Sequence, residues 1–224
     1  MTEGLIENLL DTGERVPPPA EVLRWAKIPD QDAWNAELAR DPLGFWKSCA
    51  EGLAWETAPQ QTLEGGLGDA RWFTGGRLNA TVSCLDRHVA THPDATAYIY
   101  LREDGLERRM TYAELLAATN RLANALKADG VKSGDRVCIY MPLSLEGIVG
   151  MLACARIGAI HSVVYAGLGA TALRDRIEDA GAEVVLGADR TYRRGREVDL
   201  KIILDDAVRH APRVRRVVLW RRAT

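Results

Sequence analysis

The sequence predicts an α/β fold in which a parallel sheet follows a helical lead-in. Its centre is the stretch from residue 134 to residue 165, whose pattern is typical of a strand, a helix and a second strand. Residues 137–140 form an unbroken apolar run, as expected for a strand that is buried on both faces of a parallel sheet. From about residue 97 onward, helical and extended patterns alternate, which predicts parallel strands connected by helices.

Residues 1–20 are predicted to be a weakly ordered arm, because three consecutive prolines end the one short amphipathic pattern that they contain. Residues 20–55 show a helical spacing of apolar and aromatic residues, and we expect helices that break at Pro29 and Pro42. Large aromatic side chains bury much area, so the tryptophans of this lead-in are interpreted as packing anchors rather than as platforms for a nucleobase.

The segment after the lead-in, residues 60–77, is rich in glycine and is predicted to be irregular. A helical pattern resumes at residues 78–91, where His88 is interpreted as a structural rather than a catalytic residue. Residues 97–101 and 108–110 are typical of the two arms of a β-hairpin, since an Asp-Gly turn signal lies between them.

Two helices of the α/β region carry clear start and stop signals. Thr111 and Glu114 fit a capping box, and the helix that they begin ends at Gly130. Ser144 can cap a second helix, which ends at Gly158. The remaining predicted elements are a strand at 161–165, a helix at 171–180, a strand at 183–186, a polar loop at 191–196, a helix at 205–210 and a strand at 214–220.

The composition argues against several classes of protein. A net charge of −2 gives no global attraction to nucleic acid or to an acidic membrane. No apolar run approaches the roughly 18 residues that span a membrane, and the N-terminus lacks the pattern of a signal peptide. The four cysteines contain no Cys-x-x-Cys pair, which indicates reduced thiols. We therefore predict a cytoplasmic protein without nucleic-acid or membrane partners.

The last part of the chain differs from the rest in its charge. Residues 189–224 contain eleven Lys and Arg against five Asp and Glu. Two interpretations remain open at this point: the excess is a solvated face, or it is a site for an anionic ligand.

The loop after the strand at 161–165 contains a Gly-x-Gly-x-x-Ala motif from Gly167 to Ala172, and Asp189 follows near the end of the next strand. This spacing matches the dinucleotide-binding fingerprint. Two observations weaken that interpretation, because such a unit usually opens its domain and because the loop beyond Asp189 is basic. The arginines of that loop could instead hold a phosphate by bidentate hydrogen bonds. They are Arg193, Arg194 and Arg196.

Five segments between residues 78 and 189 carry a resemblance to a known family. Together with the lead-in GFWKSCAEGLAW, they resemble the N-terminal part of AMP-forming acetyl-CoA synthetases, in the acetyl/propionyl-CoA synthetase branch of the adenylate-forming (AMP-binding) superfamily. The phrase MLACARIGAIHSVV is the most specific. The segments are LNATVSCLDRHVATHPDATAYIY, MTYAEL, GVKSGDRVCIYMP, EGIVGMLACARIGAIHSVVYAGL and LRDRIEDAGAEVVLGAD.

The resemblance implies a ligase that works in two steps. Acetate attacks the α-phosphate of ATP to give acetyl-adenylate and pyrophosphate, and the thiol of coenzyme A then displaces AMP, with Mg²⁺ on the phosphates. It also implies a flexible arm at residues 1–20, a helical N-terminal cap at 21–80 and, at 81–224, the parallel-sheet-based first part of the AMP-binding domain, truncated at its C-terminus.

The resemblance further implies a coenzyme A site. The loop from Tyr192 to Arg196 matches the family segment that binds coenzyme A, and Arg193 and Arg196 match the two basic positions that hold its phosphate-bearing adenosine end. Gly167 matches a glycine beside the path of the pantetheine arm. The chain departs from the family pattern at 166 and 169, and the second departure creates the apparent dinucleotide motif. The implied cofactor-binding residues are Gly167, Arg193, Arg194, Gly195 and Arg196.

Several family features are missing from the sequence. It has no Ser/Thr/Gly-rich loop followed by lysine for the ATP phosphates, and it lacks the C-terminal domain with the lysine that assists adenylation. We therefore expect an N-terminal fragment that is inactive alone, has no catalytic or metal-binding residues of its own, and needs the missing C-terminal portion as its partner. The alternatives are a propionate–CoA ligase, a stand-alone coenzyme A or nucleotide-binding α/β module, and a dinucleotide oxidoreductase.

Overall fold

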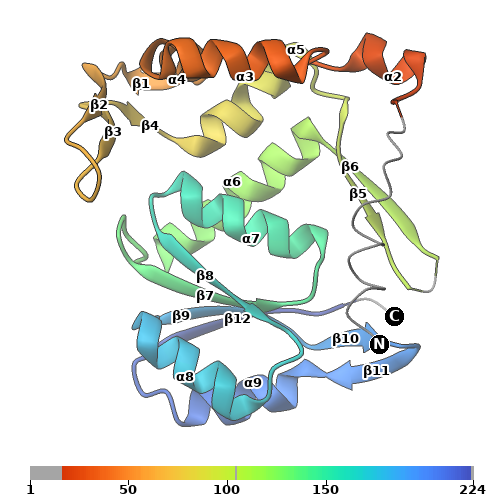
Figure 1. The fold of residues 1–224 in the computed structure, drawn as a ribbon. Coiled ribbons are helices and arrows are strands. Elements are labelled where there is room, and N and C mark those ends of the chain that lie inside the picture. The colour runs from red at the N-terminus through yellow and green to blue at the C-terminus, as the bar shows by residue number, and fades with distance from the viewer. Residues whose placement is uncertain (1–16, 104, 223–224) are drawn as a thin grey trace, which may run out of the picture. The chain divides into compact units, whose positions relative to one another are not determined.

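The computed structural model describes residues 17–103 and 105–222 (Figure 1). The chain divides into two compact units, Met1–Gly52 and Leu53–Thr224, which are described separately. Most of the predicted N-terminal arm lies outside the described residues.

The first unit is helical, as the sequence predicts. Asp30 and Asp41 cap two of its helices by accepting hydrogen bonds from the main-chain N–H groups of Ala33 and Gly44, at 2.9 and 3.0 Å. The rings of Trp34 and Phe45 pack edge to face with centroids 4.9 Å apart, which fits the interpretation of Trp34 as an anchor. That interpretation is wrong for Trp25, whose side chain is 86% exposed. The helices are α2 (Ala20–Trp25), α3 (Gln31–Arg40) and α4 (Pro42–Glu51).

The second unit begins with two small antiparallel sheets, where the sequence predicts irregular chain. The glycines that suggested irregularity instead serve tight turns: Gly65, Gly68 and Gly75 have φ values of 79°, 104° and 76°, which favour glycine. Strand β1 (Trp55–Thr57) pairs with β4 (Arg77–Leu78), and β2 (Gln61–Glu64) pairs with β3 (Arg71–Thr74).

The predicted helix, hairpin and capping box that follow are confirmed. The Thr111 hydroxyl accepts a hydrogen bond from the Glu114 N–H, and the Glu114 carboxylate accepts one from the Thr111 N–H. His88 stacks on the Tyr112 ring at 4.9 Å, in keeping with a structural role. The elements are the π-helix η1 (Val82–Asp86), α5 (Arg87–Thr91), β5 (Thr96–Leu101), β6 (Glu107–Thr111) and α6 (Tyr112–Ala128).

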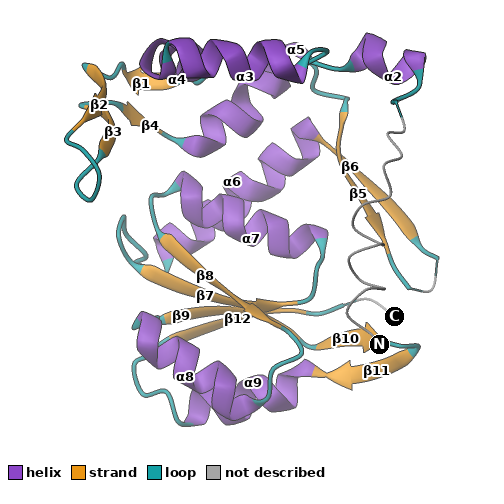
Figure 2. Cartoon of the chain, in the orientation of Figure 1, coloured by secondary structure: helices purple, strands orange, loops and turns teal. Residues whose placement is uncertain are grey.

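The core of the second unit is a parallel sheet with the strand order β12-β9-β7-β8 (Figure 2). Helices α6 and α7 lie on one face of the sheet, and α8 and α9 lie on the other. The predicted α/β architecture is therefore confirmed. The elements are β7 (Arg136–Met141), α7 (Leu145–Arg156), β8 (Ile160–Tyr165), α8 (Ala170–Ala180), β9 (Val184–Ala188), α9 (Leu200–Arg209) and β12 (Arg216–Trp220).

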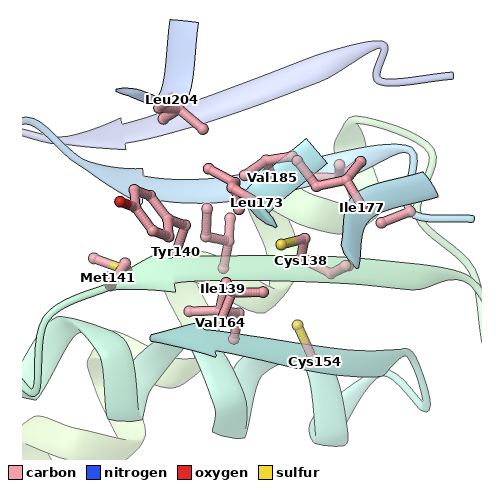
Figure 3. Packing of buried hydrophobic residues seen from close by; sticks show 14 of the residues in the cluster. Cys138, Ile139, Tyr140, Met141, Cys154, Val164, Leu173, Ile177, Val185 and Leu204 are labelled. Atoms are coloured by element: carbon pink, nitrogen blue, oxygen red, sulfur yellow. The ribbon is translucent and has the colours of Figure 1, made fainter. Parts of the chain in front are cut away.

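Strand β7 is buried on both faces, as its unbroken apolar run predicts. Its residues from Val137 to Tyr140 are each at most 1% exposed. Figure 3 shows their alternation: Cys138 and Tyr140 point toward Leu173 of α8, whereas Ile139 points to the opposite side. Burial raises the pKa of the Cys138 thiol to about 12, so this thiol stays protonated and unreactive at neutral pH.

Residues 79–86 are joined to the end of α7 by a two-pronged ion pair. The two terminal nitrogens of the Arg156 guanidinium, Nη1 and Nη2, donate to the Asp86 carboxylate at 2.8 and 2.9 Å, and Nη1 also donates to the Thr81 hydroxyl. The hydrogen bond from Arg156 lowers the pKa of the Asp86 carboxyl. The stabilisation is therefore present above the pKa that Asp86 has in the unfolded chain, and it is lost as the pH falls through the lower pKa of the folded chain.

Replacing Asp86 with asparagine is expected to lower the free energy of unfolding by about 1–2 kcal/mol at pH 7, because the Arg156 guanidinium loses a charged acceptor in a half-buried site. Urea denaturation as a function of pH measures this difference, which should shrink toward zero in acid. Asp175→Asn is the matched control, since the one described residue with which Asp175 forms an ion pair is its exposed neighbour Arg174. Equal losses in the two variants would refute the assignment.

Candidate functional site

Three loops meet the carboxyl edge of the parallel sheet, where α/β proteins commonly bind ligands. Gly167 follows strand β8, a β-hairpin follows β9, and Arg222 follows β12. Because these strands run parallel, their carboxyl ends lie at the same edge (Figure 2). Strand order therefore gathers residues from three distant parts of the sequence.

The segment predicted to be a polar loop at 191–196 is a β-hairpin. Strand β10 (Arg190–Arg193) pairs antiparallel with β11 (Arg196–Asp199), and Arg193 lies opposite Arg196. The turn residues Arg194 and Gly195 have φ values of 53° and 72°, and positive φ at both central positions is what a type I′ turn requires. The prediction was wrong because an Arg-Gly pair between short, highly charged strands is a weak hairpin signal.

The tip of this hairpin presents three exposed arginine side chains. Within the described part of the chain, the guanidinium groups of Arg193, Arg194 and Arg196 form no ion pair. By contrast, Arg190 lies 3.2 Å from carboxylate oxygens of both Asp189 and Glu197. Three cations on neighbouring residues, whose guanidinium groups form no ion pair with a described carboxylate, form a site that suits a phosphate group.

An aromatic contact fixes the base of the hairpin. The guanidinium carbons of Arg102 and Arg222 lie 5.4 and 5.0 Å from the centre of the Tyr192 ring. Arg222 is only 8% exposed, and its guanidinium donates to the Tyr100 hydroxyl at 2.9 Å. The Tyr192 hydroxyl donates to Glu197 at 3.1 Å. These contacts join the hairpin to strand β5 and to the residues after β12.

Asp189, the acid of the apparent dinucleotide motif, has structural partners. Its carboxylate accepts hydrogen bonds from the Arg222 N–H at 2.9 Å and from the Arg190 guanidinium at 3.2 Å. Burial alone would raise the pKa of Asp189, but these hydrogen bonds and the charge of Arg190 hold its pKa below the usual range. Gly169 has a φ of −75°, and an added Cβ there would meet no described protein atom within 4 Å, so the fold of the chain does not require this glycine. The structural partners of Asp189 disfavour a dinucleotide site.

Gly167, in contrast, has little space around it. A Cβ added at this residue would lie 2.2 Å from Cε1 of the Tyr165 ring, so a larger residue would displace that ring. The next residue is fixed to the sheet, because the Tyr140 hydroxyl donates to the Leu168 carbonyl at 2.8 Å. Strand β7 separates β8 from β9, which places Gly167 about 10 Å along the sheet edge from the start of the hairpin. The predicted site residues thus share one edge, in two groups.

Glu103 is a member of the site that the sequence did not suggest. Its carboxylate accepts hydrogen bonds from the main-chain N–H groups of Arg194 and Gly195, at 3.4 and 3.1 Å. Glu103 follows strand β5, about ninety residues earlier in the chain. No local signal marks such a contact, because it depends on how two hairpins meet.

An apolar groove lies beside the edge strand β8, with a volume of about 230 Å³. Among the described residues no charged side chain lines it, so it does not suit a phosphate. Val163 and Tyr165 of the edge strand are 55% and 63% exposed, so this edge of the sheet presents apolar side chains. Residues that line the groove include Tyr98, Ile99, Met141, Leu145, Ile148 and Val163.

None of the helices in residues 17–103 and 105–222 has both the length and the apolar character to cross a membrane. In the same residues, no three His, Cys, Asp or Glu side chains converge on a possible metal position.

Comparison with known sequence families gives two matches. Residues 85–222 match the AMP-binding enzyme family, and residues 31–84 match the acetyl-coenzyme A synthetase N-terminus. The two matches meet between residues 84 and 85, and the predicted domain boundary is at residue 80. The two compact units of the structure instead divide after Gly52.

Individual relatives agree with these matches. The acetyl-coenzyme A synthetase of Streptomyces avermitilis is 44% identical over 99% of this chain, which covers 34% of that protein. The human protein named acetyl-coenzyme A synthetase 2-like, mitochondrial, is 48% identical over 82% of the chain, which covers 27% of it. The solved structure of acetoacetyl-CoA synthetase from Streptomyces lividans has a TM-score of 0.77 and 26% identity, with 95% of this chain and 32% of that chain covered.

The chain spans about a third of the length of the curated relatives that it matches. Within that third, the resemblance to acetyl-CoA synthetases is confirmed by both the relatives and the family matches. Because the AMP-binding match covers residues 85–222, more than half of the sequence, the chain belongs to the AMP-binding enzyme family.

Proposed function

We propose that this chain supplies the coenzyme A-binding part of an AMP-forming acetate–CoA ligase. The whole reaction would convert acetate, ATP and coenzyme A to acetyl-CoA, AMP and pyrophosphate through acetyl-adenylate. The observation that carries the proposal is the hairpin tip, where the guanidinium groups of Arg193, Arg194 and Arg196 are exposed and form no ion pair with the described residues. Acetate is preferred to propionate because the relatives are named acetyl-coenzyme A synthetases.

In this proposal each group at the sheet edge has a separate task. Arg193 and Arg196 bind the phosphate-bearing adenosine end of coenzyme A, and the turn at Arg194 and Gly195 keeps the two side chains together. Gly167 lies beside the path of the pantetheine arm, and its lack of a side chain lets the Tyr165 ring keep its position there. Holding coenzyme A at one end directs its thiol to the adenylate and reduces the entropic cost of the second step.

ATP and Mg²⁺ are assigned to parts of the enzyme outside this chain. The sequence lacks the lysine-containing phosphate loop, and no cluster of three or more His, Cys, Asp or Glu side chains lies among the described residues, so no step is assigned to a metal that they would hold. We also propose the domain limits 21–80 and 81–224 and a cytoplasmic location.

Coenzyme A and 3′-dephospho-coenzyme A distinguish this proposal from a solvated basic face. Calorimetry of the chain should give about tenfold tighter binding of coenzyme A, because the 3′-phosphate adds charge-assisted hydrogen bonds to the arginines. In the Arg193→Ala and Arg196→Ala variants the two ligands should bind alike. Arg209→Ala is the control, since Arg209 is an exposed arginine on helix α9. Equal affinity of the wild-type chain for both ligands would refute the proposal.

A further inference from the structure

The turn of the β10–β11 hairpin already binds an anion, and that anion belongs to the chain itself. The two oxygens of the Glu103 carboxylate accept separate hydrogen bonds from the N–H groups of Arg194 and Gly195, at 3.4 and 3.1 Å. We call these two N–H groups the turn amides. Consecutive main-chain N–H groups in a turn of positive φ form a concave site that favours anions.

The groups around the turn amides favour a stronger anion than a carboxylate. Arg193, Arg194 and Arg196 lie on the same tip, and among the described residues none of their guanidinium groups pairs with Glu103. A phosphate group carries up to two charges and three acceptor oxygens, so it could contact the turn amides and the guanidinium groups together. The Glu103 carboxylate, which accepts hydrogen bonds from the two turn amides, uses only some of the hydrogen-bond donors at the hairpin tip.

We propose that Glu103 is an internal competitor for the phosphate site at the hairpin tip. Its carboxylate occupies the turn amides in the free chain, and a ligand phosphate must displace it in order to bind. The residue thereby sets the affinity of the site and excludes weaker anions. This inference rests on the proposed coenzyme A function, because the phosphate in question is the one on the adenosine end of that molecule.

The alternative role for Glu103 is to hold the hairpin in place. Other contacts already do so, since Tyr192 packs against Arg222, and Arg222 donates to Tyr100 of strand β5. Glu103 is itself exposed, and displacing it costs little burial. A holding role predicts weaker phosphate binding when the carboxylate is removed, whereas a competing role predicts stronger binding.

Calorimetry with adenosine 3′,5′-bisphosphate, the adenosine end of coenzyme A, separates the two roles. Glu103→Gln and Glu103→Ala should each lower the Kd by about threefold to tenfold, the effect of removing a charge-assisted competitor at an exposed site. Glu107→Gln is the matched control, because the exposed Glu107 carboxylate on β6 pairs with Arg109. It should leave the Kd unchanged.

Unchanged or weaker binding in both Glu103 variants would overturn the competitor role. The proposed coenzyme A site is judged separately, by whether Arg196→Ala abolishes binding in the Glu103→Gln background. If Glu103→Gln binds tightly and Arg196→Ala has no effect on it, the turn amides bind anions but the arginine site fails. If no variant binds adenosine 3′,5′-bisphosphate at about 10 mM, a concentration well above a millimolar Kd, both proposals fail.

Discussion

Replacing Arg196 with glutamate is expected to raise the coenzyme A KM by about 100-fold, because the change removes a phosphate-binding cation and places a negative charge beside the ligand. The first half-reaction should be spared. Adenylation consumes acetate and ATP before coenzyme A is needed, so acetate-dependent ATP–pyrophosphate exchange should keep its wild-type rate. This separation distinguishes loss of a binding site from loss of the fold.

The measurement needs an enzyme with the length of the relatives. A suitable protein is a chimera in which this chain replaces the matching third of the Streptomyces avermitilis acetyl-coenzyme A synthetase, to which it is 44% identical. Arg209→Glu serves as the control, since it makes the same charge change on the exposed end of α9. If Arg196→Glu reduces both half-reactions equally, the arginine supports the structure rather than coenzyme A.

The second large effect concerns the packing of helix α8 on the parallel sheet. Leu173 is fully buried. Together with Ile177 of the same helix it lies against the sheet, near Val185 of strand β9 (Figure 3). Leu173→Ala is expected to lower the free energy of unfolding by about 2–5 kcal/mol, because it removes buried methyl groups and leaves a cavity that close-packed neighbours fill only in part.

Urea denaturation of the chain measures this loss, and Leu143→Ala provides a control with the same chemical change. Leu143 is 96% exposed, so its truncation should alter the free energy of unfolding by less than about 0.5 kcal/mol. A loss below about 1 kcal/mol for Leu173→Ala would mean that α8 does not pack on the sheet as described.

The central part of the fold could be predicted from the sequence because its signals are local. The apolar run of β7, the Ser144 cap and the Gly158 stop each lie within a few residues of the element that they define. The same holds for the capping box at Thr111. The burial of α7 is less local, because the helix packs on both the sheet and α6, and its most buried residues include Ala153 and Cys154.

The site could be predicted only in part. Arg193, Arg194 and Arg196 stood out in the sequence because they crowd the loop beyond Asp189, but the hairpin that presents them depends on pairing and on a positive φ at Arg194. Glu103 and Arg222 could not be found from local patterns. Their contacts join strand β5 to residues that lie about 90 and 120 positions later, and such contacts exist only after the sheet has assembled.

The most direct test of the proposed coenzyme A site is an NMR titration of the ¹⁵N-labelled chain with coenzyme A. If the hairpin tip and Gly167 bind coenzyme A, the largest amide shift changes will occur at residues 192–197 and next to Gly167, at the edge where these residues lie. Changes confined to the apolar groove around Leu145 and Ile148, with the hairpin amides unmoved, would contradict this proposal.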